Sequence, residues 1–163
     1  MLLISGFICQ RTQINGLTNR VAQATYESRA HAWMSLEQAK QGIQAGLQEN
    51  VANLLGPKIT ASSGLTSAQK AVGVLATLDP TGHNWNPIIL ALGEAATTLD
   101  SIPTDGPIAQ PERKKLSDIL ELVSEVAGAL PATNPSDSSI LVWNDALIDK
   151  ATTKALAFSA LSQ

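Results

Sequence analysis

Residues 14–54 read INGLTNRVAQATYESRAHAWMSLEQAKQGIQAGLQENVANL, and this stretch decides the fold of the chain. Apolar or small residues recur in it at alternating intervals of three and four over about five to six heptads, which is typical of an amphipathic helix or a coiled coil. The pattern predicts one long helix from about Arg11 to Leu55, roughly 65 Å in length at 1.5 Å per residue. Its apolar face mixes leucine with alanine, serine and glycine, so the helix needs other helices along most of its length.

Glycine and proline mark the expected interruptions of this helix. Gly42 and Gly46 lie four residues apart, a spacing that permits close approach of a second helix and also allows a kink. Gly56 followed by Pro57 is a typical stop signal, because glycine adopts the left-handed cap and proline does not continue the helix. We therefore expect the helix to end near Leu55, with a Ser- and Gly-containing linker over residues 57–65.

Shorter helices are predicted in the remainder of the chain. A capping-box pattern formed by Thr66 and Gln69 opens the first of them, and prolines at the first turn open the second and third. The predicted ranges are 66–78, 87–99, 111–130 and 140–161, with the first residues of the last range also compatible with a strand. The fold class is therefore all-α, a long N-terminal amphipathic helix packed on a bundle of about four shorter helices. We predict one domain over residues 1–163, comprising an arm (1–10), the long helix (11–55) and the bundle (66–161).

Residues 2–8 form a short apolar segment before the long helix. We expect an extended arm that docks on a partner, either as a strand added to a sheet edge or packed in a groove. The run is too short to span a bilayer, and it lacks the basic n-region and the small residue before Cys9 that an export signal requires. No signal peptide and no transmembrane segment are predicted, and the compartment stays open.

Composition excludes several classes of partner. The 163 residues are 44% hydrophobic but only 4% aromatic and 15% charged, with a net charge of -3. Nucleic acid and anionic lipid attract clustered Lys and Arg, so we expect no nucleic acid partner and no membrane span. Cys9 is the only cysteine, which excludes an intrachain disulfide and a thiolate metal cluster.

The residues with chemical potential are few. Glu27 and His31 share a helix face but bring no further metal ligand, and His83 lies in a turn, where we expect a solvent-facing side chain. The run 113–115, Arg-Lys-Lys, opens a predicted helix where the dipole disfavours cations, and a solvated first turn explains it better than a bound anion. No phosphate-binding loop is present. We predict no catalytic residue, metal or cofactor, and not an enzyme.

The sequence favours a non-enzymatic structural or assembly subunit that self-associates or is embedded in a larger protein particle, with a virion as the first setting to consider. The alternative is a helical binding module or adaptor for a peptide or small apolar ligand, with a pocket lined by Ile88, Leu92, Leu120 and Val123. An enzyme would instead need polar groups clustered around His83 or Glu94. Trp33 packs either on a partner or on the chain's own bundle, and both readings stay open. The interface candidates on the arm and long helix are Leu2, Leu3, Ile4, Phe7, Ile8, Ile14, Leu17, Val21, Trp33, Leu36, Ile43 and Leu47.

Overall fold

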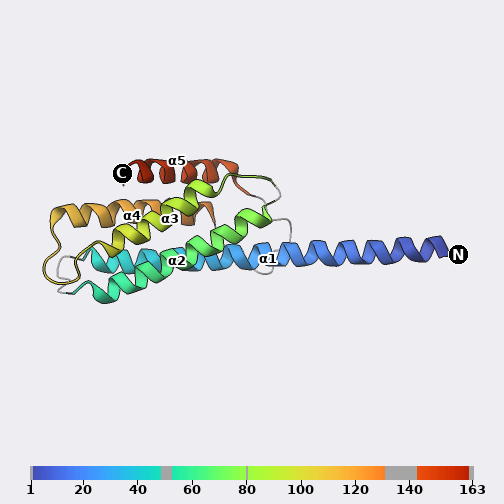
Figure 1. Cartoon of the computed structure of the whole chain (residues 1–163), viewed down its shortest axis with the longest axis horizontal. Coiled ribbons are helices and arrows are strands. Elements are labelled where there is room, and N and C mark those ends of the chain that lie inside the picture. Colours follow the sequence, from blue (N-terminus) through green and yellow to red (C-terminus); the bar gives the residue numbers. More distant parts are fainter. Residues whose placement is uncertain (1, 49–52, 80, 131–142, 162–163) are drawn as a thin grey trace.

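The computed structural model describes the whole chain except residues 1, 49–52, 80, 131–142, 162 and 163, and for residues 2–15 it describes the backbone only. The described residues form five α-helices and no strand, which confirms the all-α fold class. The helices are α1 (Leu2–Gly46), α2 (Leu55–Leu78), α3 (Asn86–Asp100), α4 (Gln110–Ala129) and α5 (Asp145–Leu161). Figure 1 shows α1 as a rod that leaves the bundle at one end and carries the N-terminus far from it.

The helix α1 begins and ends earlier than predicted. It starts at Leu2, so the expected extended arm is wrong: residues 2–8 continue the rod as helix. It ends at Gly46 rather than near Leu55, and it is continuous through Gly42. After this end, the guanidinium of Arg113 donates a hydrogen bond to the carbonyl of Leu47 (3.1 Å). A cation from α4 thus occupies the carboxyl end of α1, where the helix dipole favours positive charge.

The predicted linker over residues 57–65 is also wrong, because these residues belong to α2. Gly56 and Pro57 lie in its first turn, where the missing N–H of proline has no intrahelical acceptor to lose. The backbone N–H of Leu55 donates to the side chain of Asn53 (2.7 Å), which satisfies one donor at the start of the helix. Thr66 and Gln69 lie in the middle of α2, so they do not form the expected capping box. Instead, Gln69 donates to the carbonyl of Ile89 in α3 (3.1 Å).

The later helices follow the sequence pattern more closely. The structure confirms α3 and α4 to within a residue of their predicted bounds. The last helix starts at Asp145, and Trp143 precedes it, so the predicted start at residue 140 is too early; residues 140–142 lie outside the described part of the chain. The ammonium of Lys58 in α2 donates hydrogen bonds to the carbonyl of Asp100, the last residue of α3, and to that of Ile102 (2.7 and 2.9 Å).

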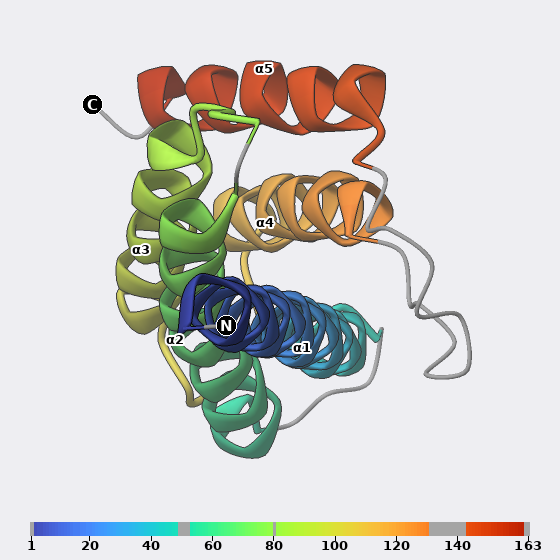
Figure 2. The same cartoon turned by 90° about the vertical axis from the view of Figure 1, so that its right-hand side faces the viewer.

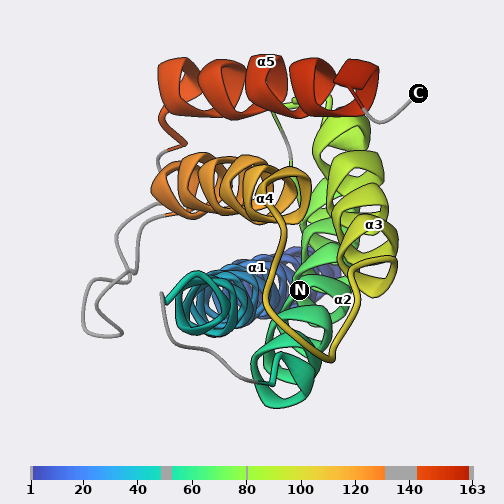
Figure 3. The same cartoon turned by 90° about the vertical axis from the view of Figure 1, so that its left-hand side faces the viewer.

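The helices α1 and α2 form one layer of the bundle, α3 and α4 form a second layer, and α5 packs on the outer side of the second layer. In the described chain α1 packs on α2 and α4, α2 on α3, and α5 on α3 and α4. Figures 2 and 3, seen from the two ends of the rod, place α5 on the side of α3 and α4 that is remote from α1. The core between the layers consists mainly of Ala, Leu, Ile and Val, and it includes the fully buried Trp85. Two ion pairs join α5 to α4 at the surface, Lys150 with Glu125 and Lys154 with Glu121.

The contact between α1 and α2 is close enough to involve backbone. A methyl group added at Gly64 of α2 would lie 2.6 Å from both the amide nitrogen of Ala39 and the carbonyl oxygen of Ser35 in α1. At Gly42 of α1 it would lie 2.6 Å from the amide nitrogen of Ala61. Since real Cβ atoms do not approach backbone so closely, only glycine fits at these two positions. The predicted role of Gly42 in close helix packing is confirmed.

We predict that Gly64→Ala forces α1 and α2 apart and lowers the free energy of unfolding by roughly 1–3 kcal/mol or more. Gly73, in the same helix, has open space around it. Gly73→Ala is the matched control, and it should raise stability by up to about 1 kcal/mol because alanine favours the helix. Urea denaturation followed by circular dichroism measures both changes. Equal effects of the two substitutions would contradict the close contact.

Candidate functional site

The projecting segment, which we define as residues 2–23 of α1, contains most of the predicted interface residues. Leu17 and Val21 lie on it with 61% and 48% of their surface exposed, and all eight residues 16–23 are exposed. The side chains of five further candidates on the arm (Leu2, Leu3, Ile4, Phe7 and Ile8) and that of Ile14 lie outside the described part of the structure. The described part of the segment is therefore free of cover by the chain's own bundle.

The predicted interface residues farther along α1 pack against the chain's own bundle. Leu36 and Ile43 are buried in the core, so the predicted interface role of these two residues is replaced by a core role. Leu47 is partly buried against the same core. Trp33 is half-buried. Among the predicted interface residues whose side chains are described, Leu17 and Val21 in the N-terminal half of α1 are exposed, whereas Leu36 and Ile43 are buried.

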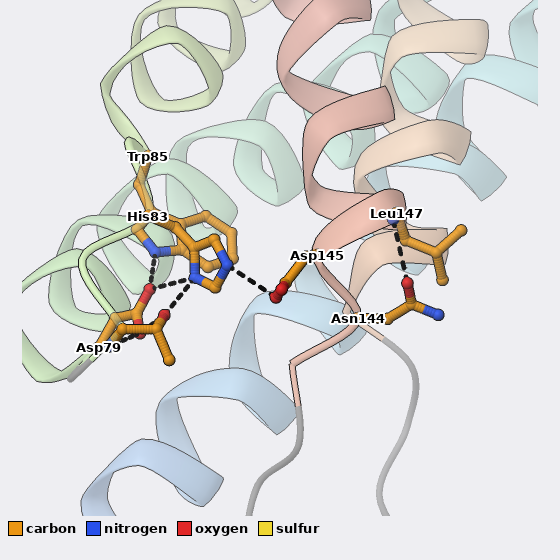
Figure 4. Close-up of polar contacts among 7 residues, drawn as sticks. Asp79, His83, Trp85, Asn144, Asp145 and Leu147 are labelled. Atoms are coloured by element: carbon orange, nitrogen blue, oxygen red, sulfur yellow. Dashed lines mark hydrogen bonds and ion pairs between the residues drawn. The ribbon is translucent and has the colours of Figure 1, made fainter.

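A second candidate region is the polar cluster around His83, where the turn between α2 and α3 meets the start of α5 (Figure 4). The Nδ1 atom of His83 lies 2.8 Å from a carboxylate oxygen of Asp79, and its Nε2 atom lies 3.0 Å from an oxygen of Asp145. The indole N–H of Trp85 donates to the same carboxylate of Asp79 (2.8 Å), as does the hydroxyl of Thr81. The imidazole thus links two segments that are 62 residues apart in sequence.

Aromatic rings and an arginine enclose this cluster. The rings of Trp85 and Trp143 meet edge to face with their centroids 5.2 Å apart, and His83 contacts both. The guanidinium of Arg29 from α1 lies 5.0 Å from the ring centroid of Trp143, a cation–π contact. Arg29 is buried, and desolvation lowers its pKa. The cluster therefore holds α1, the turn before α3 and the residues before α5 together.

The charges of the cluster favour the imidazolium form of His83. Burial alone would lower the pKa of His83, but hydrogen bonds and charge attraction from Asp79 and Asp145 raise it above the ordinary value. A neutral imidazole has one N–H, whereas here both nitrogens face carboxylate oxygens, so only the protonated ring donates to both. Burial likewise opposes ionisation of Asp79, but hydrogen bonds from Thr81, Trp85 and His83 lower its pKa to about 2.

The arrangement of Asp79, His83 and Asp145, which we call the latch, is a structural link rather than a general base. Both ring nitrogens of His83 are occupied by carboxylates, so neither is available to take a proton from a substrate. The prediction of a solvent-facing histidine is wrong, because the side chain is only 14% exposed. Spacing within the sequence could reveal Asp79, four residues away, but not the distant Asp145.

An open depression of about 740 Å³ lies between α3, α4 and α5 near Glu94. Three of its polar side chains have partners within the protein: the carboxylate of Glu94 accepts a hydrogen bond from the hydroxyl of Ser159, and the hydroxyls of Thr97 and Ser101 donate to backbone carbonyls. A nucleophile needs an adjacent base to be activated, and none of these hydroxyls is bonded to a histidine. The predicted apolar pocket is not formed, since Ile88, Leu92 and Val123 are fully buried and Leu120 is packed against the core.

The remaining candidates have ordinary partners. The carboxylate of Glu27 accepts a hydrogen bond from the side chain of Gln23 (2.9 Å), and the described residues contain no group of three metal-ligating side chains. Arg113, considered above as a possible anion ligand, binds the carbonyl of Leu47 instead. Among the described helices we find none with the length and apolar character needed to cross a membrane.

Comparison of the chain with protein-family models, with curated proteins and with solved structures finds no match.

We predict that the latch makes stability depend on pH through His83. The pKa of His83 is raised above the ordinary value of 6.5, so its contribution is complete below that pH and is lost as the pH rises through the folded pKa. The free energy of unfolding should therefore fall as the pH rises above 6.5 and through the raised pKa of His83. In His83→Gln this decline should be reduced or absent, and in Asp145→Asn it should be smaller than in the unsubstituted protein. Urea denaturation across this range measures it.

The other histidine supplies the control for this prediction. His31 is exposed on α1, outside the cluster, so His31→Gln should keep the full decline. If the free energy of unfolding of the unsubstituted protein and that of His83→Gln changed with pH in parallel, the latch would contribute nothing to the pH dependence of stability.

Proposed function

We propose that this chain is a non-enzymatic structural subunit that self-associates through the projecting segment of α1. The observation that carries the proposal is the exposure of Leu17 and Val21 on a rod that extends beyond the bundle (Figure 1). A virion or another large protein particle is the setting we propose for such a subunit.

The apolar stripe of α1 supports this proposal by its continuity. Leu17 and Val21 belong to the same three-and-four pattern as Ala32, Leu36 and Ala39, which are fully buried in the core. Within the bundle, α2 and α4 pack on this helix. Beyond the bundle the pattern continues, and the part of the chain that the structure describes leaves it uncovered. A second molecule is the natural cover for an apolar stripe of this kind.

Helix energetics point the same way. Most of the stability of a helix in a protein comes from packing of its apolar face and not from intrinsic helix propensity. The described part of the projecting segment contains Gly16, Asn19 and Val21, which are poor helix formers. Burying a leucine or valine side chain contributes about 1.5–3 kcal/mol, so association would stabilise the rod as well as join the subunits.

We predict that the full chain forms oligomers at micromolar concentration in sedimentation equilibrium. The double substitution Leu17→Glu with Val21→Glu should weaken association by at least about 100-fold, or about 2.7 kcal/mol, because it places carboxylates in the buried stripe. The melting temperature of the bundle should change little, since both residues are exposed within the monomer.

Leu90 supplies the control, because it is as exposed as Leu17 but lies on α3. Leu90→Glu should leave association unchanged. A chain that stays monomeric up to millimolar concentration would overturn the proposed function, and so would equal effects of the glutamates on α1 and on α3.

A further inference from the structure

We infer that the partner of the projecting segment is the same segment of a second copy, and that the two helices pair antiparallel, each covering the exposed stripe of the other up to the end of its bundle. This inference rests on the proposed function and specifies its partner. A two-fold axis crosses the two rods at right angles beside residue 12 of each copy. Residues of the two copies whose numbers add to 24 therefore lie opposite each other.

The helix α2 covers the same face of α1 within the bundle, and it runs antiparallel to α1. Gly42 of α1 lies against Ala61 of α2, whereas Ala39 lies against Gly64, so residue numbers rise along α2 as they fall along α1. At 100° per residue, Leu17 lies within about 40° of the direction of Ala39 and Gly42 around the helix axis. The exposed stripe is thus the continuation of the face that α2 covers.

The end of α2 limits where a second helix can lie on this face. Leu78, the last residue of α2, is 17 residues beyond Ala61, so α2 ends beside about residue 25 of α1. Burial agrees with this position, because residues 16–23 are exposed whereas Thr25 is buried. A parallel partner in register would continue past residue 25 and meet α2. An antiparallel partner avoids this collision, since its own bundle lies beyond the N-terminal end of the first rod.

The spacing of the stripe is symmetric about residue 12. In the projecting segment the stripe positions follow one another at intervals of four, three, four, three and four, and they are Leu3, Phe7, Gln10, Ile14, Leu17 and Val21. When numbers that add to 24 lie opposite, each of these positions faces another of them. Leu17 faces the partner's Phe7, and Gln10 is the polar residue of the seam, facing the partner's Ile14. A single polar residue in such a seam specifies the register at a cost in stability.

The other registers of this stripe are excluded by the observed burial. Stripe positions next face each other after a shift of seven residues. Numbers that add to 31 would place residue 2 opposite Arg29, which is buried in the chain's own bundle. Numbers that add to 17 would leave Leu17 and Val21 opposite no residue of the partner's α1. The register about residue 12 covers the exposed residues and stops short of the buried ones.

The two arginines of the projecting segment give this arrangement an electrostatic signature. Arg11 lies one residue from the two-fold axis, on the flank of the stripe, so it meets Arg11 of the other copy; Arg20 lies opposite residue 4. The repulsion between the two Arg11 side chains is screened by salt. Arg11→Gln should therefore tighten the dimer roughly two- to fivefold at low ionic strength. Arg20→Gln is the matched control and should leave the affinity unchanged.

Mixed disulfide cross-linking of the full-length chain tests the direction and the register. Cys9 is first replaced by serine, so that each variant carries a single cysteine. The cysteine of Leu17→Cys in one copy then faces that of Phe7→Cys in the other. Two copies of either variant have their cysteines ten residues apart, or about 15 Å, beyond the roughly 4.4–6.8 Å between Cα atoms that a disulfide requires. Under mild oxidation, the mixture of the two variants should form covalent dimers at least tenfold faster than either variant alone.

Asn19 supplies the control for the cross-linking experiment, because it lies on the side of α1 opposite the stripe. Cys9→Ser with Asn19→Cys, mixed with the Phe7→Cys variant, should cross-link at least tenfold more slowly than the mixture of the Leu17 and Phe7 variants. Circular dichroism verifies that each variant is folded.

The outcomes separate the two proposals. A dimer in sedimentation with fast cross-linking only in the mixture of the Leu17 and Phe7 variants supports the inference. A dimer in which the Leu17 variant alone cross-links as fast as the mixture overturns the antiparallel direction, and one in which the mixture is no faster than the Asn19 control overturns the register. Both results leave self-association through α1 standing, as does a larger oligomer, which overturns the two-stranded pairing. A monomer overturns both the inference and the proposed function.

Discussion

The contact between the backbones of α1 and α2 at Gly42 and Gly64 is the constraint on which the rest of the structure depends. It joins the rod to the bundle along the C-terminal half of α1, where the small Ala32 and Ala39 lie beside the larger Leu36 and Ile43 in the core. Small residues bury little area, so their stabilisation comes from many close contacts between the two helices. Because α1 is one continuous helix, its N-terminal half extends from this contact as a rod beyond one end of the bundle (Figure 1).

The cluster around His83 fastens the bundle at another point. It contains residues from three separate parts of the chain, with Arg29 on α1, Asp79 and His83 between α2 and α3, and Asp145 at the start of α5. The last helix is held mainly by buried apolar side chains such as Ile148 and Phe158, because its ion pairs to α4 are partly exposed and surface pairs contribute little. Asp145 is itself 79% exposed, so the strength of the latch lies in the buried carboxylate of Asp79, whose side chain is 1% exposed.

Sequence patterns were sufficient for elements whose signals are local. The helices α3 and α4 each begin with a proline in the first turn, and their bounds follow from it. The pair Gly56-Pro57 was misleading, because proline is compatible both with the end of one helix and with the first turn of the next. Ser62, Ser63 and Gly64 resemble a linker, yet they are helical because α1 passes against Gly64. The latch could not be predicted either, since Asp145 meets His83 only after the bundle has formed.

The exposure of the apolar stripe along α1 separates the two halves of the helix. Where α2 covers the helix, the contact positions include alanine and glycine, which allow backbones to touch. Where the bundle ends, the same stripe continues with Leu17 and Val21, which are exposed, although a rod that stayed in water would favour polar residues there. Larger residues suit helices whose axes lie farther apart, as in a coiled coil, because they fill the space between the backbones. The stripe thus changes from covered to exposed where the bundle ends, and the cover that we propose for its exposed part is a helix of another molecule.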